Sequence, residues 1–131
     1  MTKIHDLQQL GQSIWLDYIR RQFITNGGLQ ASLQDGVRGV TSNPSIFEKA
    51  IAGSMDYDVA MKPLAEAGQS VEEIYDALVI EDIQMAADIL RPIYDESGKV
   101  DGYISLEVSP TLAHDTDGTV ADARRYWAAV D

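Results

Sequence analysis

The segment GVTSNPSIFEKAI, residues 39–51, joins a predicted strand to a predicted helix. The strand covers residues 37–41. Pro44 can take the first helical position after it, because the missing N–H of a proline would be unpaired there anyway. Asn43 is then the natural N-cap, although residues 45–48 offer a competing capping box. The segment therefore predicts a short strand that passes directly into a helix.

The alternation of strand and helix continues on both sides of this segment. Residues 13–19 and 102–109 are short, largely apolar runs typical of buried strands. Helical spacing, caps and stop signals predict further helices over 20–24, 29–33, 57–67, 71–94 and 119–131. Pro92 is expected to kink or end the longest of them. Strands that alternate with helices indicate βα units around a parallel sheet, so we predict an α/β fold.

Polar side chains stand in or near the carboxyl-terminal half of each predicted strand. Asp17 and Glu107 interrupt two of the apolar runs. Thr41 is the last residue of the strand over 37–41, and Asn43 lies two residues further on. A charged group inside a parallel strand is costly, and this end of α/β sheets carries the chemistry. We therefore expect the four side chains to converge, where the carboxylates can move protons and the neutral groups can hold hydroxyls. The same residues can also be explained without a catalytic role. The Thr-Ser-Asn-Pro run can be an ordinary helix start, and each acid can be the partner of a structural arginine.

Composition narrows the class of protein. The 131 residues include 10 basic and 21 acidic side chains, a formal net charge of -11, which argues against a nucleic-acid partner. There is no cysteine, and His5 and His114 lie too far apart in sequence to indicate a metal site. The sequence has no signal-peptide pattern and no apolar run near the roughly 20 residues of a membrane span. These observations predict a cytoplasmic protein without a membrane partner.

Three segments together resemble the transaldolase family, most closely its longer bacterial type: SIWLDYIRR (13–21), GVTSNPSIFEKAI (39–51) and DGYISLEVSPTLAHDT (101–116). The resemblance implies a (β/α)8 TIM barrel of the class I aldolase type, which uses no cofactor and no metal. It implies transfer of a dihydroxyacetone unit from a ketose phosphate, such as sedoheptulose 7-phosphate or fructose 6-phosphate, to an aldose phosphate. This reaction of the pentose phosphate pathway proceeds through a lysine Schiff base.

The resemblance also implies roles for individual residues. Asp17 would take the proton from the substrate's C4 hydroxyl, and Glu107 would act through a water when the imine forms and is hydrolysed. Thr41 and Asn43 would hold that water or the sugar hydroxyls. Sugar phosphates would be the substrates of the complete enzyme.

One feature of the family is missing. Its Schiff-base lysine lies on the fourth strand, whereas the four lysines present all fall in polar or solvated positions: Lys3, Lys49, Lys62 and Lys99. We therefore expect residues 1–131 to be the first three βα units of an incomplete barrel, inactive alone. A barrel fragment of this kind exposes unpaired strand edges, so self-association is expected. The alternative is a non-catalytic module that assembles with itself or with a complementing piece.

Overall fold

The computed structural model describes all residues from Met1 to Asp131. The chain alternates strands with helices as follows: α1 (Lys3–Gln9), β1 (Trp15–Asp17), α2 (Arg21–Thr25), α3 (Gly28–Gln34), β2 (Gly39–Thr41), α4 (Pro44–Ala52), α5 (Asp58–Glu66), α6 (Val71–Glu96), β3 (Tyr103–Ile104), the 3-10 turn η1 (Pro110–Leu112) and α7 (Thr116–Val130). The predicted α/β alternation is therefore present. No helix combines the length and apolarity that a membrane crossing requires.

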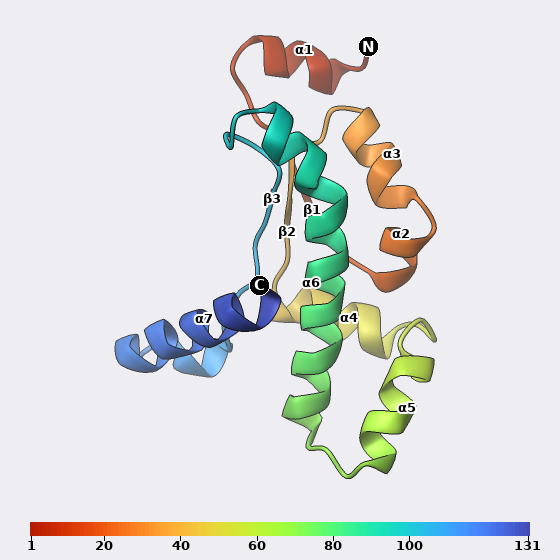
Figure 1. The fold of residues 1–131 in the computed structure, drawn as a ribbon, viewed down its shortest axis with the longest axis vertical. Helices are drawn as coiled ribbons and strands as arrows, with labels where there is room; N and C mark the ends of the chain where they lie inside the picture. Colours follow the sequence, from red (N-terminus) through yellow and green to blue (C-terminus); the bar gives the residue numbers. More distant parts are fainter.

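The three strands form one parallel sheet in the order β1-β2-β3. Trp15 pairs with Gly39 and Asp17 with Thr41, while Val40 pairs with Ile104. The helices α2, α3 and α6 lie on one side of the sheet (Figure 1). β1 and β3 are the two edges of the sheet, so each offers backbone groups on its outer side.

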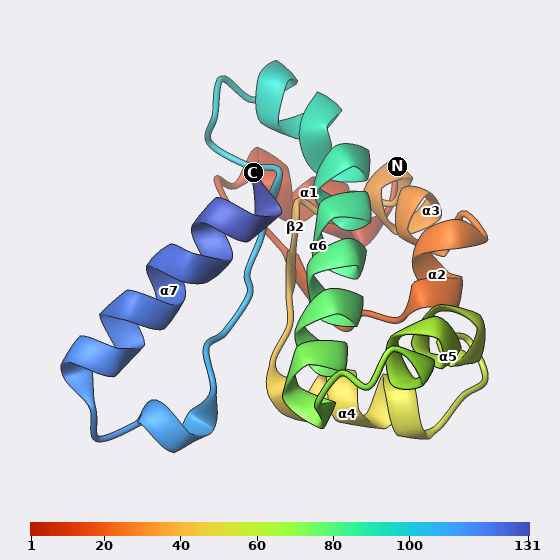
Figure 2. The same cartoon turned by 60° about the horizontal axis from the view of Figure 1, so that its bottom comes forward.

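The hydrophobic core lies between the sheet and α6. Nine buried side chains from the helices and strands build it: Ile19, Ile24, Leu29, Val40, Phe47, Val79, Ile83, Ala86 and Leu90. Ile104 on β3 and Leu106 just after it pack against this cluster. The opposite face of the sheet has no helix over it, and Trp15 remains 38% exposed there. The ring of Tyr103, 42% exposed, packs edge-on against Tyr94 of α6. Figure 2 shows α6 along one side of the strands and α7 slanting from the outlying segment around η1 back toward α6.

The strands are shorter than the sequence indicated. The expected runs 13–19, 37–41 and 102–109 contract to three, three and two residues. A strand exists only where its backbone pairs with a neighbour, and the apolar pattern extends beyond that pairing. An apolar run therefore indicates which residues are buried against the helices, and it overestimates how many of them pair with a neighbouring strand.

Two helix boundaries differ from those predicted. α6 continues through Pro92 to Glu96. Pro92 and Asp88 are both exposed, so water can reach the carbonyl that the proline leaves without a helical donor. The last helix begins at Thr116 instead of Thr119, because the Asp115 side chain accepts a hydrogen bond from the backbone N–H of Gly118.

A buried ion pair joins three helical segments on the side of the sheet that α6 covers. The carboxylate of Asp82, fully buried on α6, accepts hydrogen bonds from Arg21 Nε and from the Tyr57 hydroxyl, both at 2.7 Å. Arg21 also donates to the carbonyl of Leu78, and its backbone N–H donates to the Tyr57 hydroxyl. Burial raises the pKa of Asp82, while the hydrogen bonds from Tyr57 and Arg21 act in the opposite direction. The network fixes the chain just after β1 against α6.

Candidate active site at the carboxyl end of the sheet

Asp17 and Thr41 form the most direct polar contact at the carboxyl end of the sheet. They are register partners on adjacent strands, and the Thr41 hydroxyl donates a hydrogen bond of 2.8 Å to Asp17 Oδ1. In a parallel pair with this register the two side chains project from the same face. A threonine hydroxyl in this position fixes the orientation of the carboxylate and leaves its second oxygen free to act on a bound molecule.

Asn43 has the structural role that its position indicated. Its side-chain oxygen accepts a hydrogen bond of 2.9 Å from the backbone N–H of Ile46, which caps α4. The predicted cap is therefore confirmed, and the competing capping box that begins at Ser45 is not used. The cap leaves the amide NH₂ of Asn43 without a hydrogen bond within the chain, so it remains able to hold a ligand.

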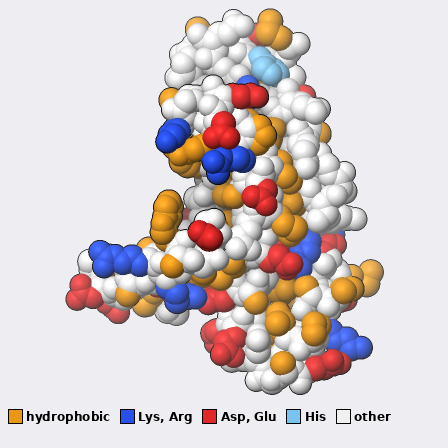
Figure 3. All heavy atoms as spheres, in the orientation of Figure 1, with side chains coloured by type: hydrophobic (Ala, Val, Ile, Leu, Met, Phe, Trp, Pro, Cys, Tyr) orange, Lys and Arg blue, Asp and Glu red, His pale blue; other side chains and the backbone are white.

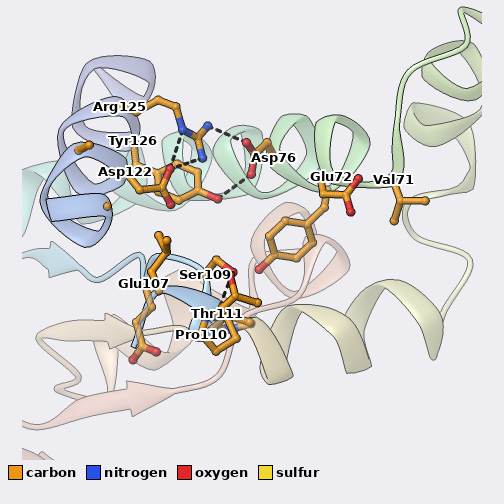
Figure 4. A pocket seen from close by; sticks show the side chains of 15 residues that line it. Val71, Glu72, Asp76, Glu107, Ser109, Pro110, Thr111, Asp122, Arg125 and Tyr126 are labelled. Atoms are coloured by element: carbon orange, nitrogen blue, oxygen red, sulfur yellow. Dashed lines mark hydrogen bonds and ion pairs between the residues drawn. The ribbon is translucent and has the colours of Figure 1, made fainter. Parts of the chain in front are cut away.

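Glu107 lies beyond the end of β3, on an extended segment without strand pairing. Its side chain is exposed and lines a groove of about 690 Å³ between α6, α7 and the segment around η1. Figure 4 shows its carboxylate at the end of the side chain that points away from Arg125. Neither Asp17 nor Thr41 lines this groove. The structure thus brings Asp17 and Thr41 into contact, and it leaves Asn43 and Glu107 nearby on the same end without direct contact to that pair.

The groove beside Glu107 does not suit an anion. Arg125 is its only basic lining residue, and it already pairs with Asp76 at 2.6 Å and with Asp122 at 2.7 Å (Figure 4). The Tyr126 hydroxyl donates to the second oxygen of Asp76, and burial raises the pKa of Tyr126. The hydrogen bond with Asp122, followed by the one with Asp76, raises the pKa of Arg125. The contact with Asp76 ties α7 to α6, and the two acids together neutralise the guanidinium charge.

The two acids predicted to lie within strands are more exposed than the sequence indicated. Asp17 and Glu107 were expected inside covered strands, but both are exposed. The reason is the uncovered face of the sheet, onto which Asp17 projects together with Trp15. The buried acid of this chain is Asp82, which pairs with a structural arginine. The arginine pairing considered for the strand acids therefore occurs on α6 instead.

Sequence reasoning missed the residues that hold the site in place. Asp82 lies at helical spacing among the buried apolar positions of α6. An acid on an apolar helix face could have been recognised from the sequence as a buried, paired group. Ser42 is 1% exposed, and its hydroxyl donates a hydrogen bond of 2.6 Å to the carbonyl of Ser105. Nothing in the sequence marked Ser42 beyond its place between Thr41 and Asn43.

The four lysines and two histidines lie outside this site. All four lysines are exposed, and Lys62 pairs weakly with Glu66 at 3.9 Å. His5 takes part in the cap of α1 with Thr2. No group of three or more histidine, aspartate or glutamate side chains is arranged to hold a metal ion.

The fold and the site define a class of protein: a parallel α/β protein whose polar groups gather at the carboxyl ends of neighbouring strands. Residues 14–131 match the family model described as transaldolase/fructose-6-phosphate aldolase. The match covers most of the chain, and the chain belongs to this family. The resemblance drawn from the three sequence segments is thereby confirmed.

Relatives in several bacteria support the same assignment. A transaldolase of Thiobacillus denitrificans is 50% identical over 132 residues, which cover 100% of this chain and 37% of that protein. A protein named transaldolase 2 of Nostoc punctiforme is 48% identical, with 95% of this chain and 33% of that protein covered. A transaldolase of Thermobifida fusca is 47% identical, with 99% and 36% covered. The chain spans about a third of the length of these relatives.

Proposed function

We propose that residues 1–131 supply the acid–base part of a transaldolase active site. The complete enzyme would transfer a dihydroxyacetone unit from a ketose phosphate to an aldose phosphate through a lysine Schiff base, in the pentose phosphate pathway. The observation that carries the proposal is the hydrogen bond between Thr41 and Asp17 at the carboxyl end of two parallel strands. The family membership of the chain supports it independently.

The residues have distinct roles in this proposal. Asp17, oriented by Thr41, accepts the proton of the substrate's C4 hydroxyl as the carbon–carbon bond breaks. Glu107 acts through a water in forming and hydrolysing the imine, and the free amide NH₂ of Asn43 holds that water or a sugar hydroxyl. The remaining strands of a (β/α)8 barrel would cover the open face of the sheet and bring Glu107 toward the pair.

The Schiff-base nucleophile is not among the four lysines of this chain. An amine that attacks a carbonyl must be unprotonated, and proteins achieve this by desolvating it or placing it near another cation. Lys3, Lys49, Lys62 and Lys99 are all exposed, which keeps them solvated. We therefore expect the isolated chain to be inactive.

A borohydride trap tests the missing nucleophile. The chain is incubated with fructose 6-phosphate, reduced with borohydride and analysed by intact mass, with the Thiobacillus denitrificans transaldolase treated in parallel. We expect an adduct on that enzyme and an unchanged mass for residues 1–131. A three-carbon or six-carbon adduct on any lysine of this chain would overturn the assignment.

A chimera tests the acid–base role. Residues 1–131 are joined to the complementary part of the Thiobacillus denitrificans transaldolase, and transfer from fructose 6-phosphate to an aldose phosphate is measured. We expect activity, and a loss of about 10²-fold to 10⁴-fold in kcat for Asp17→Asn. Asp6→Asn, which changes an exposed acid on α1, is the matched control. An inactive chimera that folds as a barrel would contradict the proposal.

A non-catalytic role is the second candidate. The exposed Trp15 on the open sheet face and the two free edges favour a module that associates with a copy of itself. Figure 3 shows hydrophobic side chains reaching the surface along the middle of the molecule, with acidic side chains scattered between them. Measuring the mass of the chain in solution at several concentrations separates a monomer from such an assembly.

A further inference from the structure

The backbone ladder between β2 and β3 stops before it reaches Glu107. The N–H of Ser105 donates to the carbonyl of Val40 at 3.0 Å, which continues the pairing of Val40 with Ile104 by one bond. In a regular parallel pair the next bond would run from the N–H of Ser42 to the carbonyl of Ser105. That bond is absent, and Glu107 makes no backbone hydrogen bond to β2.

Two serine side chains replace the missing bond. The Ser42 hydroxyl donates to the carbonyl of Ser105 at 2.6 Å, and the backbone N–H of Ser42 donates to the Ser105 hydroxyl at 3.3 Å. Each serine therefore supplies one side-chain group and one backbone group to its partner. Ser42 is only 1% exposed, so water competes little for these bonds.

We infer that Ser42 is a positioning residue for Glu107, and this inference rests on the proposed function. Ser42 directly follows Thr41, and Ser105 lies two residues before Glu107. The reciprocal serine pair is the last lateral link between the two strands on the way to that carboxylate. It therefore sets the separation between Glu107 and the Asp17–Thr41 pair, although Ser42 itself points away from the open face.

The place of Ser42 in the fold also explains why a serine lies between β2 and α4. Ser42 is flanked by Thr41, whose side chain reaches Asp17, and by Asn43, whose side chain caps α4. The three consecutive polar side chains thus bond to three different elements: β1, the segment after β3 and the first turn of α4. A buried alanine at 42 would fill most of the same space but would leave the carbonyl of Ser105 without its donor.

The first experiment measures this geometry in the chain itself. Backbone order of Ser105 and Glu107 is followed by ¹⁵N relaxation in the wild type and in Ser42→Ala, with Ser45→Ala as the matched control. Ser45 is exposed on α4 and makes no side-chain hydrogen bond. We expect Ser42→Ala to increase fast motion at residues 105–107 while β1 stays ordered. Unchanged order at Glu107 in Ser42→Ala would overturn the inference.

The second experiment measures the consequence for turnover in the chimera described above. We expect Ser42→Ala to lower kcat by about 10-fold to 100-fold with KM nearly unchanged, because a misplaced proton-transfer group slows the reaction more than it weakens binding. Ser42→Thr keeps the hydroxyl and is expected to retain most of the turnover. A purely structural role would lower the amount of folded enzyme without this change in kcat per folded molecule.

The two experiments separate the possible failures. An inactive wild-type chimera contradicts the proposed function, while the relaxation measurement still decides whether Ser42 holds Glu107. An active wild-type chimera with unchanged kcat in Ser42→Ala overturns the positioning role and leaves the proposed function intact.

Discussion

The indole ring of Trp15 lies against Gly39, its register partner on the neighbouring strand. A Cβ atom at position 39 would overlap the ring atoms of the tryptophan. Gly39 is therefore needed because of a close approach across the sheet, and its backbone has ordinary strand geometry. The contact covers part of the open sheet face with an aromatic ring that belongs to the edge strand.

Gly39→Ala is expected to destabilise the chain by about 1 to 3 kcal/mol, because the added methyl group must displace the Trp15 ring. Chemical denaturation followed by circular dichroism measures the change, and tryptophan fluorescence reports the displacement. In a Trp15→Ala background the same substitution should have little effect. An equal penalty in both backgrounds would show that the ring is not the cause.

Asp82→Asn is expected to lower the free energy of unfolding by about 3 kcal/mol, since it removes the buried counter-charge of Arg21 and leaves only the exposed Glu81 as its partner. Tyr57→Phe removes one hydrogen bond of the same network and should cost about 1 kcal/mol. Asp88→Asn, an exposed acid on the same helix, is the control and should change stability by less than about 0.5 kcal/mol. Equal effects of the Asp82 and Asp88 substitutions would contradict the role of the network.

Stability should fall at acid pH through Asp56. The Arg20 guanidinium donates to both oxygens of Asp56 and holds the pKa of this carboxyl below its ordinary value of 3.8. The unfolded chain then binds more protons than the folded chain in this range, so the free energy of unfolding rises with pH. The contribution is complete above the ordinary pKa and is lost as pH falls through the lowered one.

Denaturant unfolding between about pH 5 and about pH 2 measures this contribution. Asp56→Asn should flatten the dependence, and Arg20→Gln should flatten it to a similar extent. Asp58→Asn, which removes a carboxylate from the same segment, is the control with which the pH dependence of these variants is compared. A slope in Asp56→Asn as steep as in the wild type would contradict the assignment.

Self-association of the chain should grow with concentration and with ionic strength, because salt screens the net charge of -11 that keeps copies apart. Light scattering coupled to size-exclusion chromatography measures the mass. Tyr103→Lys places a charge on the edge strand and should shift the chain toward the monomer. Val59→Lys changes a side chain that is 87% exposed on α5, away from the sheet, and should leave the mass unchanged. A monomer at all concentrations would exclude this association.

Local signals in the sequence predicted much of the fold. The cap at Asn43 and the proline that opens α4 are both present, because each depends on groups only a few residues apart. The order of the three strands and of the other helices followed from the same signals, whereas α1 and η1 were not predicted. Because strand ends are predicted from local signals, the four candidate side chains were expected at the carboxyl end of the sheet, where they lie.

Contacts between distant segments decided the rest. The contact of Asp17 with Thr41 depends on strand register, and the burial of Asp82 depends on Arg21 arriving from another helix. The reciprocal bonds of Ser42 and Ser105 join residues that are 63 positions apart. The sequence by itself thus determined the order of the strands and of most helices, since their signals are local, but it did not determine the paired length of the strands. Tertiary structure alone decided which side chains are buried, exposed or paired, because those properties depend on what packs against each element.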